Sequence, residues 1–215
     1  RDSKVKLMSL CSIGVVNEDD PAASYFYGAD KTISFGEDQA ISIQAHPTDR
    51  GLHLSGLIEG KPIDKDVAVF GQFNQENIAA AIAACLALGE SADALISHLS
   101  LLTPVPGRME LHQQAGHPDI VIDYAHTPDA LQKALEALRP HCKGKLWCVF
   151  GCGGDRDQDK RSIMGSIAEQ FADQIIVTSD NPRGEDPDII MQAIGAGMNQ
   201  QPMMIASRTP PKPSA

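Results

Sequence analysis

The sequence predicts an α/β fold in two parts, and three observations support this prediction. Residues 1–70 contain short runs in which apolar and polar side chains alternate between glycines and prolines, a pattern typical of strands. Residues 73–102 are rich in Ala and Leu, which favour helices. After residue 118, a strand pattern followed by a helix pattern occurs three times. We therefore expect a part that is strand-rich and then helical, followed by a βαβαβα part.

The first part is expected to contain strands and then two helices. Strands are predicted within residues 4–12, 22–35 and 40–71. The first helix is predicted to take Asn74 as its N-cap and to end at Gly89, because Asn caps helix starts well and Gly suits helix ends. The second helix is predicted to begin after the N-cap Ser91.

A linker is predicted at TPVPGR, residues 103–108, because two prolines and a glycine interrupt the helical pattern there. We place the domain boundary inside it, with one domain at residues 1–106 and a second at 107–215. In the second domain, right-handed crossovers make βαβαβα a parallel, doubly wound, Rossmann-like sheet. Ligands of such sheets bind at the carboxyl ends of the strands, next to a switch in strand order.

The composition is that of a globular protein and excludes several classes. The 215 residues are 42% hydrophobic and 21% charged, with a formal net charge of −10. We therefore expect neither nucleic acid nor an anionic membrane as partner, and no apolar run is long enough for a transmembrane helix. The 5 cysteines form no CxxC pair, which indicates reduced thiols in the cytoplasm and no metal site.

Three loops are expected at the carboxyl ends of the strands in the second domain, and each is rich in groups that bind ligands. They are DYAHTP at residues 123–128, GCGGDRDQDKR at 151–161 and SDNPR at 179–183. Because these strand ends meet at one edge of a parallel sheet, we expect the loops to form one site.

The glycine-rich loop allows two interpretations. Its glycines let backbone N–H groups approach an anion at a helix start, but GxGG also suits a plain tight turn. Arg156 stands between Asp155 and Asp157, and an arginine held by carboxylates is presented in a fixed pose for a ligand carboxylate. Lys160 and Arg161 are interpreted as surface residues in the first turn of the next helix.

The DYAHTP loop combines candidate ligand contacts with signals for a helix start. Asp123 at a strand end suits the hydroxyl groups of a ribose, whereas His126 is either a structural residue or a site residue. Thr127 is predicted as N-cap and Pro128 as the first helical residue.

Two further candidates lie outside these loops. Asn74 and Asn77 share a helix face and are candidate contacts for an adenine or a ribose. Arg108, directly after the prolines, is either a surface charge or a residue that faces a cleft between the domains.

Five segments together resemble the MurE-type Mur ligases, the UDP-N-acetylmuramoyl-tripeptide synthetases of bacterial cell-wall precursor synthesis. They occur in the family's order and read GQFNQEN, PVPGRME, IDYAHTPDAL, LWCVFGCGGDRDQDKR and SDNPRGEDP. The resemblance implies that residues 1–106 are part of a central ATPase domain and that residues 107–215 are most of a C-terminal Rossmann-like domain.

The resemblance implies an ATP-dependent ligase that forms an amide through an acyl phosphate, with Mg²⁺ as the family's metal ion. The residues implied to bind ATP are Asn74, Arg108, Asp123 and His126. The residues implied to bind the incoming amino acid are Arg156, Asp180, Asn181, Pro182 and Arg183. The main Mg²⁺ ligands of the family are expected outside this chain.

In the members of this family that add meso-diaminopimelate, the DNPR motif recognises the distal end of that amino acid, so the resemblance implies meso-diaminopimelate rather than lysine as the incoming amino acid. Meso-diaminopimelate carries an ammonium and a carboxylate at its distal end. Asp180 and Asn181 offer acceptors to the ammonium, and the Arg183 fork suits the carboxylate, while Pro182 stiffens the loop. Lysine would leave Arg183 unmatched. The predicted substrates are therefore meso-diaminopimelate, UDP-MurNAc-L-Ala-D-Glu and ATP.

Two motifs of the family, the P-loop GxxxxGK[ST] and GKGHE, do not occur in this sequence. We therefore expect this chain alone to be an inactive part of a monomeric ligase. Two alternatives remain open. One is another Mur or folylpolyglutamate-type ligase with a different amine donor, and the other is a non-catalytic module that binds a nucleotide or an amino acid.

Overall fold

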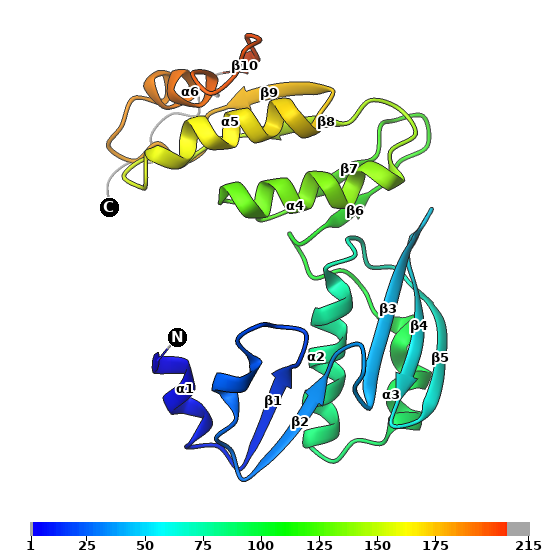
Figure 1. The fold of residues 1–215 in the computed structure, drawn as a ribbon. Helices are drawn as coiled ribbons and strands as arrows, with labels where there is room; N and C mark the ends of the chain where they lie inside the picture. Colours follow the sequence, from blue (N-terminus) through cyan, green and yellow to red (C-terminus); the bar gives the residue numbers. More distant parts are fainter. Residues whose placement is uncertain (1, 206–215) are drawn as a thin grey trace, which may run out of the picture. The chain divides into compact units, whose positions relative to one another are not determined.

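The computed structural model of the protein describes residues 2–205, and the chain divides into two compact units between Ile122 and Asp123 (Figure 1). Unit 1 precedes this point, and its elements are α1 (Asp2–Met8), β1 (Ile13–Asn17), the 3₁₀ helix η1 (Ala23–Phe26), β2 (Lys31–Phe35), β3 (Ile41–Thr48), β4 (Gly51–Ile58), β5 (Lys61–Val67), α2 (Asn74–Ala87), α3 (Ala92–His98), the 3₁₀ helix η2 (Leu99–Leu101), β6 (Glu110–His112) and β7 (Ile120–Ile122). The elements of unit 2 are α4 (Pro128–Leu138), the 3₁₀ helix η3 (Arg139–His141), β8 (Trp147–Phe150), α5 (Asp159–Phe171), β9 (Gln174–Thr178), α6 (Pro187–Gly195) and β10 (Met203–Ile205).

The main sheet of unit 1 has three antiparallel strands in the order β3-β4-β5. Along β3, the side chains of Ile41, Ile43 and Ala45 are buried, while Gln44 and His46 between and after them are exposed. This period of two is the pattern that predicted strands over residues 40–71. The strand prediction for this region is confirmed.

A tight turn joins β4 to β5. Glu59 and Gly60 have φ angles of 50° and 77°, and the flanking residues Ile58 and Lys61 pair with each other. Two positive φ angles in a two-residue connection match the right-handed twist of the strands. The turn therefore fixes the register that buries Leu54, Ile58 and Ile63 on the core face.

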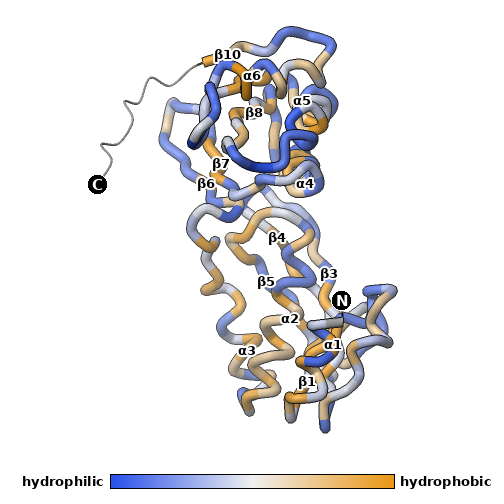
Figure 2. Tube along the Cα trace, turned by 90° about the vertical axis from the view of Figure 1, so that its left-hand side faces the viewer, coloured by the Kyte–Doolittle hydropathy of each residue, from blue (hydrophilic) through white to orange (hydrophobic). Residues whose placement is uncertain are grey.

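Helix α2 contacts β1, β2 and β3 and carries mainly the hydrophobic colours of Figure 2. It ends as predicted at Gly89, which has a φ of 97°. The N–H of Gly89 donates to Leu86 O at 3.0 Å and the N–H of Glu90 donates to Cys85 O at 3.1 Å. These two bonds close a Schellman motif and pair carbonyls that the helix leaves without partners.

The helix starts of unit 1 agree with the sequence in one case and not in the other. Ser91 caps α3 by accepting from the N–H of Ala94 at 3.3 Å, as predicted. The prediction that Asn74 caps α2 is wrong, because Asn74 is the first helical residue and its Nδ2 donates to Phe70 O at 2.7 Å. Its Oδ1 accepts from Asn77 Nδ2 at 2.9 Å, so the side chain is used locally.

The first predicted strand is also wrong, because residues 4–12 begin in the helix α1. Lys, Leu and Met are good helix formers, and Lys6 in the last turn interacts favourably with the helix dipole. Within residues 22–35, only β2 is a strand, and it pairs in parallel with β1.

Unit 2 is an α/β unit with a parallel sheet in the order β10-β9-β8, and α5 contacts both α4 and α6 (Figure 1). Its core contains Leu135, Met164, Ala168, Val177 and Ile194. The α/β fold class predicted from the alternating pattern is therefore confirmed. No helix in the described part of the chain is both long and apolar enough to cross a membrane.

One strand of the predicted βαβαβα series pairs differently. Residues 119–125 contain only the short strand β7, which pairs antiparallel with β6 and belongs to unit 1. The short connection between β6 and β7 lets them pair locally as a hairpin. The domain boundary between residues 106 and 107 stays a prediction.

Candidate functional site

Unit 2 contains a pocket with a volume of about 300 Å³. Its lining residues come from three separate loops and the start of α5 and are Asp123, Tyr124, Ala125, His126, Gly151, Cys152, Gly153, Lys160 and Asp180. Gly151 directly follows β8, and Asp180 follows closely after β9. The pocket therefore lies at the carboxyl ends of these two parallel strands, where open α/β sheets bind ligands.

The first loop of the pocket is held by its own backbone and by a lysine. Nδ1 of His126 lies 3.0 Å from Tyr124 O, and the two rings are 5.1 Å apart between centroids. Nζ of Lys160 donates to the backbone oxygen of His126 at 2.8 Å. Thr127 caps α4 and Pro128 opens it, as predicted. The loop leaves Asp123 and His126 in the pocket lining.

The glycines of the second loop allow two backbones to touch. A Cβ on Gly151 would lie 2.2 Å from the carbonyl oxygen of Thr178, and one on Gly154 would lie 1.9 Å from that of Pro182. Both distances are far below van der Waals contact, so only glycine fits at these positions. Contact between the loops after β8 and β9 therefore explains these two glycines.

Hydrogen bonds join the same two loops. The N–H of Gly154 donates to Asn181 O at 2.9 Å, and Nη1 of Arg183 donates to Gly154 O. The N–H of Gly184 donates to Oδ2 of Asp155 at 3.2 Å. Asp155 and Arg183 both have left-handed backbones, with φ angles of 52° and 49°. Such conformations persist only where the surroundings fix them, as these contacts do.

A buried ion pair lies beside these contacts. Nη1 and Nη2 of Arg161 each donate to a carboxylate oxygen of Glu185 at 2.8 Å, and the N–H of Asp155 donates to the same carboxylate at 2.6 Å. The Arg161 side chain is 2% exposed. The bonds from Arg161 and from the Asp155 N–H lower the pKa of Glu185, and the bond to Glu185 raises the pKa of Arg161.

The cysteines near the pocket are thiols at neutral pH. Burial raises the pKa of Cys148 to about 12 and also raises the pKa of Cys152. Sγ of Cys152 lies 3.8 Å from Sδ of Met164, inside the core of unit 2. Within residues 2–205, no group of three or more His, Cys, Asp or Glu side chains is arranged to hold a metal ion.

The structure corrects two interpretations of the GCGGDRDQDKR loop. The interpretation of Lys160 and Arg161 as plain surface residues is wrong, since Lys160 lines the pocket and Arg161 is buried. Arg156 is not held between carboxylates, because Asp155 accepts from Gly184 and Asp157 accepts from a helix N–H instead. The side chain of Arg156 is exposed, with no hydrogen bond or ion pair to another described residue.

The structure brings together only some of the predicted site residues. Asp123, His126 and Asp180 share the pocket, while the other amino-acid candidates, Arg156 and residues 181–183, lie outside its lining. Asn74 and Arg108 belong to unit 1, and Arg108 is exposed. Their roles in ATP binding stay predictions.

Residues that the sequence reading missed are Lys160, Arg161 and Glu185. A signal for Arg161 existed, because it lies at helical spacing from Met164 and Ala168, which are buried on one face of α5. An arginine on that apolar face needs an acidic partner. The sequence gives no comparable signal for which carboxylate that partner is.

Two family models match the chain. The model described as the Mur ligase middle domain matches residues 1–85, and the model described as the Mur ligase glutamate ligase domain matches residues 107–209. A curated relative, UDP-N-acetylmuramoyl-L-alanyl-D-glutamate–2,6-diaminopimelate ligase of Vibrio vulnificus strain YJ016, is 53% identical over 132 residues. That match covers 61% of this chain and 27% of the relative.

Solved structures of Mur ligases also match this chain. A structure of a UDP-N-acetylmuramoyl-L-alanyl-D-glutamate–2,6-diaminopimelate ligase matches with 31% identity and a TM-score of 0.63, over 96% of this chain and 46% of that one. MurF from Acinetobacter baumannii shares the fold at 20% identity, with a TM-score of 0.70 over 90% of this chain and 42% of that one. The chain thus spans less than half the length of these relatives.

Proposed function

Because the chain belongs to the Mur ligase family, we propose that the full-length protein containing it is an ADP-forming ligase of peptidoglycan precursor synthesis. The reaction adds meso-diaminopimelate to UDP-MurNAc-L-Ala-D-Glu at the expense of ATP. The observation that supports this function best is the convergence of the DYAHTP, GCGG and SDNPR loops on one pocket of unit 2.

The proposed reaction has two steps. An oxygen of the D-Glu carboxylate attacks the γ-phosphorus of ATP, which forms an acyl phosphate and releases ADP. The amine of meso-diaminopimelate then attacks the acyl carbon, phosphate leaves, and the amine gives up a proton as the amide forms. Both steps need the reacting groups to be aligned and shielded from water, which a pocket between fixed loops provides.

The pocket residues suit the phosphate side of this reaction. Asp123 supplies an acceptor for ribose hydroxyls, and Lys160 supplies a positive charge beside His126. Asp180 shares the pocket, and its carboxylate is an acceptor for the ammonium of the incoming amino acid. These residue types therefore fit an ATP-dependent reaction of an amine. Asn74 and Arg108 are proposed as further ATP contacts.

No cluster of three or more His, Cys, Asp or Glu side chains among residues 2–205 could form an all-protein metal site. Mg²⁺ in nucleotide sites is usually held by one or two carboxylates together with substrate phosphates, and the Mg²⁺ of the proposed reaction is assigned to no residue of this chain.

The residues proposed to select the amino acid lie beside the pocket. Arg183 uses one guanidinium nitrogen for the bond to Gly154 O, which leaves further N–H groups for the distal carboxylate of meso-diaminopimelate. Asn181 adds an acceptor for the distal ammonium, and Pro182 restricts the loop between them. Arg156, exposed on the facing loop, is a second proposed carboxylate contact.

The acidic net charge of −10 supports small molecules rather than nucleic acid or a membrane as partners. We infer a monomeric protein that acts in the cytoplasm, where its nucleotide substrates are made.

Phosphate release by the full-length protein tests the proposed function. The assay contains ATP, Mg²⁺ and UDP-MurNAc-L-Ala-D-Glu, with meso-diaminopimelate, with L-glutamate or without an added amine. We expect turnover only with meso-diaminopimelate. Turnover with glutamate alone would instead support another Mur-type ligase with a different amine donor, and turnover with glutamate only after a folate acceptor is added would support a folylpolyglutamate-type ligase. Nucleotide binding without turnover on any amine would support a non-catalytic module and contradict the proposal.

A further inference from the structure

One carboxylate of unit 2 connects three segments of the candidate site. Glu185 follows the SDNPR loop and accepts two bonds from Arg161 in the first turn of α5. It also accepts from the N–H of Asp155 in the glycine-rich loop at 2.6 Å and from Nε2 of Gln158 at 3.4 Å.

The burial of this ion pair and its bidentate geometry restrict the position of Glu185 relative to α5. Arg161 is 2% exposed and the Glu185 side chain 19% exposed, so water screens the two charges little. A bidentate arginine–carboxylate pair allows only a narrow range of relative positions. The backbone at Glu185 is therefore fixed relative to α5, and α5 belongs to the core of unit 2 through Met164 and Ala168.

The backbone at Glu185, which the ion pair fixes, is close in sequence to Arg183, the residue proposed to select the amino acid. Arg183 lies two positions before Glu185, has a φ of 49°, and donates to Gly154 O. The intervening Gly184 donates to the carboxylate of Asp155. Anchors on both sides thus hold Arg183 in a backbone conformation that a non-glycine residue rarely adopts.

We propose that Arg161 and Glu185 are positioning residues for amino-acid selection, because their buried ion pair holds the 179–185 loop in the conformation that presents Arg183 to the distal carboxylate of the substrate. This inference rests on the proposed function. Neither residue is proposed to touch a substrate. Their effect passes through the backbone of the loop, and the step it controls is recognition of the amino acid.

A second ion pair of unit 2 provides a matched control. Nη1 of Arg139 donates to Oδ2 of Asp173 at 2.7 Å, and the same oxygen accepts from the N–H of Leu146 at 2.7 Å. Asp173 precedes β9 and Leu146 precedes β8, so this pair lies at the amino ends of the strands, opposite the candidate site. Removing its carboxylate charge is therefore expected to perturb unit 2 at the end opposite the 179–185 loop.

The test is steady-state kinetics of the full-length protein with Glu185→Gln, Glu185→Asp and Asp173→Asn variants. We expect Glu185→Gln to raise KM for meso-diaminopimelate about tenfold or more, with a smaller change in kcat and in KM for ATP. Its preference for meso-diaminopimelate over lysine should fall as well. Glu185→Asp keeps the charge and should recover part of the loss, and Asp173→Asn should keep the wild-type KM.

The outcomes separate this inference from the proposed function. Wild-type turnover together with an unchanged KM in Glu185→Gln would overturn the inference alone, as would an equal rise of KM in Asp173→Asn. Absence of diaminopimelate-dependent turnover in the wild type would overturn both. If Glu185→Gln does not fold, Arg161→Lys replaces it, since lysine keeps the charge but not the bidentate fork, and the same expected and contradicting results apply.

Discussion

The β3-β4-β5 sheet of unit 1 and the loops at the strand ends of unit 2 are stabilised by different kinds of contact. In the sheet, Leu52, Leu54 and Ile58 are 0% exposed and contact other apolar side chains. At the strand ends of unit 2, the loops are held by the charged Arg161, a buried residue in the first turn of α5, and by hydrogen bonds between segments far apart in sequence. Apolar packing is non-directional, whereas these polar contacts each define one geometry. The polar contacts of the loops therefore fix one conformation, whereas the apolar packing of the sheet mainly provides stability.

The largest effect is expected from removing a buried side chain in the sheet. Leu54→Ala leaves a cavity in the core of unit 1 and should lower the free energy of unfolding by about 2–5 kcal/mol. Leu57 on the same strand is 45% exposed, so Leu57→Ala should cost less than about 1 kcal/mol. Urea denaturation followed by circular dichroism measures both. Equal losses would contradict the burial pattern of β4.

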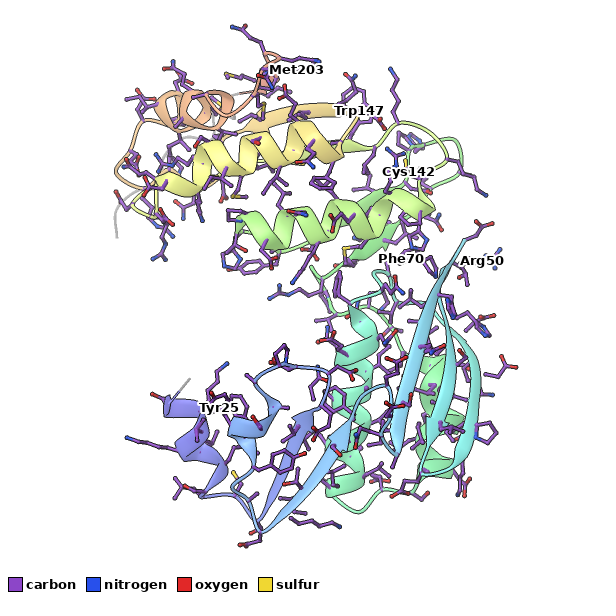
Figure 3. All side chains as sticks on the ribbon, viewed as in Figure 1. Tyr25, Arg50, Phe70, Cys142, Trp147 and Met203 are labelled. Atoms are coloured by element: carbon purple, nitrogen blue, oxygen red, sulfur yellow. The ribbon has the colours of Figure 1, made fainter. Side chains whose placement is uncertain are left out.

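The next effect is expected at the contact between the loops. Gly154→Ala places a Cβ against the carbonyl oxygen of Pro182 and should cost about 1–3 kcal/mol, because the two backbones must separate. Trp147 is the single tryptophan and lies on β8 (Figure 3), so its fluorescence reports on unit 2 during denaturation.

A matched glycine provides the control for this loop variant. A Cβ on Gly144 would meet nothing within 4 Å, so Gly144→Ala should change the free energy of unfolding by less than about 0.5 kcal/mol. A Gly154→Ala protein as stable as Gly144→Ala would show that the loops do not need this close backbone contact.

A pH dependence distinguishes the ion pair from apolar packing. Because the pKa of Glu185 lies below its usual 4.5, the folded state favours its charged form. The stability from the pair is therefore fully present above pH 4.5 and is lost as pH falls through the lowered pKa. The difference in unfolding free energy between wild type and Glu185→Gln should be constant near neutral pH and shrink under acid. A difference that is independent of pH would contradict a charged Glu185.

The smallest effect is expected at a helix cap. Ser91→Ala removes the acceptor for the Ala94 N–H and should cost about 1 kcal/mol. Ser97 on the same helix donates back to Ala94 O and lies 3.3 Å from Nδ1 of His98 but caps no backbone N–H, so Ser97→Ala should cost less than Ser91→Ala. Thermal unfolding compares the two variants, and a larger loss for Ser97→Ala would contradict the assigned cap.

The same contrast explains what could be predicted from the sequence. The strands over residues 40–71 and the helices α4, α5 and α6 follow local periodicity, which the sequence displays directly. Exceptions occur where local signals are short or ambiguous. Residues 4–12 alternate only briefly and begin in a helix, and Asn74 uses its side chain inside α2 rather than as a cap.

The candidate site was predictable as a location but not in its detailed contacts. Asp123, His126 and Asp180 line one pocket as expected, but only Asp180 follows a strand of the parallel sheet, since Asp123 and His126 follow the antiparallel strand β7. The pairing of Arg161 with Glu185 joins residues on either side of β9, and no local pattern specifies such a pair. For the same reason the sequence did not show that Asp155 accepts from Gly184 rather than holding Arg156.

A comparison of two substrates tests the proposal that the 179–185 loop selects an amino acid by its distal carboxylate. Phosphate release by the full-length protein is measured with meso-diaminopimelate and with L-lysine, for wild type and Arg183→Ala. We predict that the wild type prefers meso-diaminopimelate by about 100-fold or more in kcat/KM and that Arg183→Ala loses most of this preference. Equal use of lysine by the wild type, or an unchanged preference in Arg183→Ala, would show that this loop does not select the amino acid.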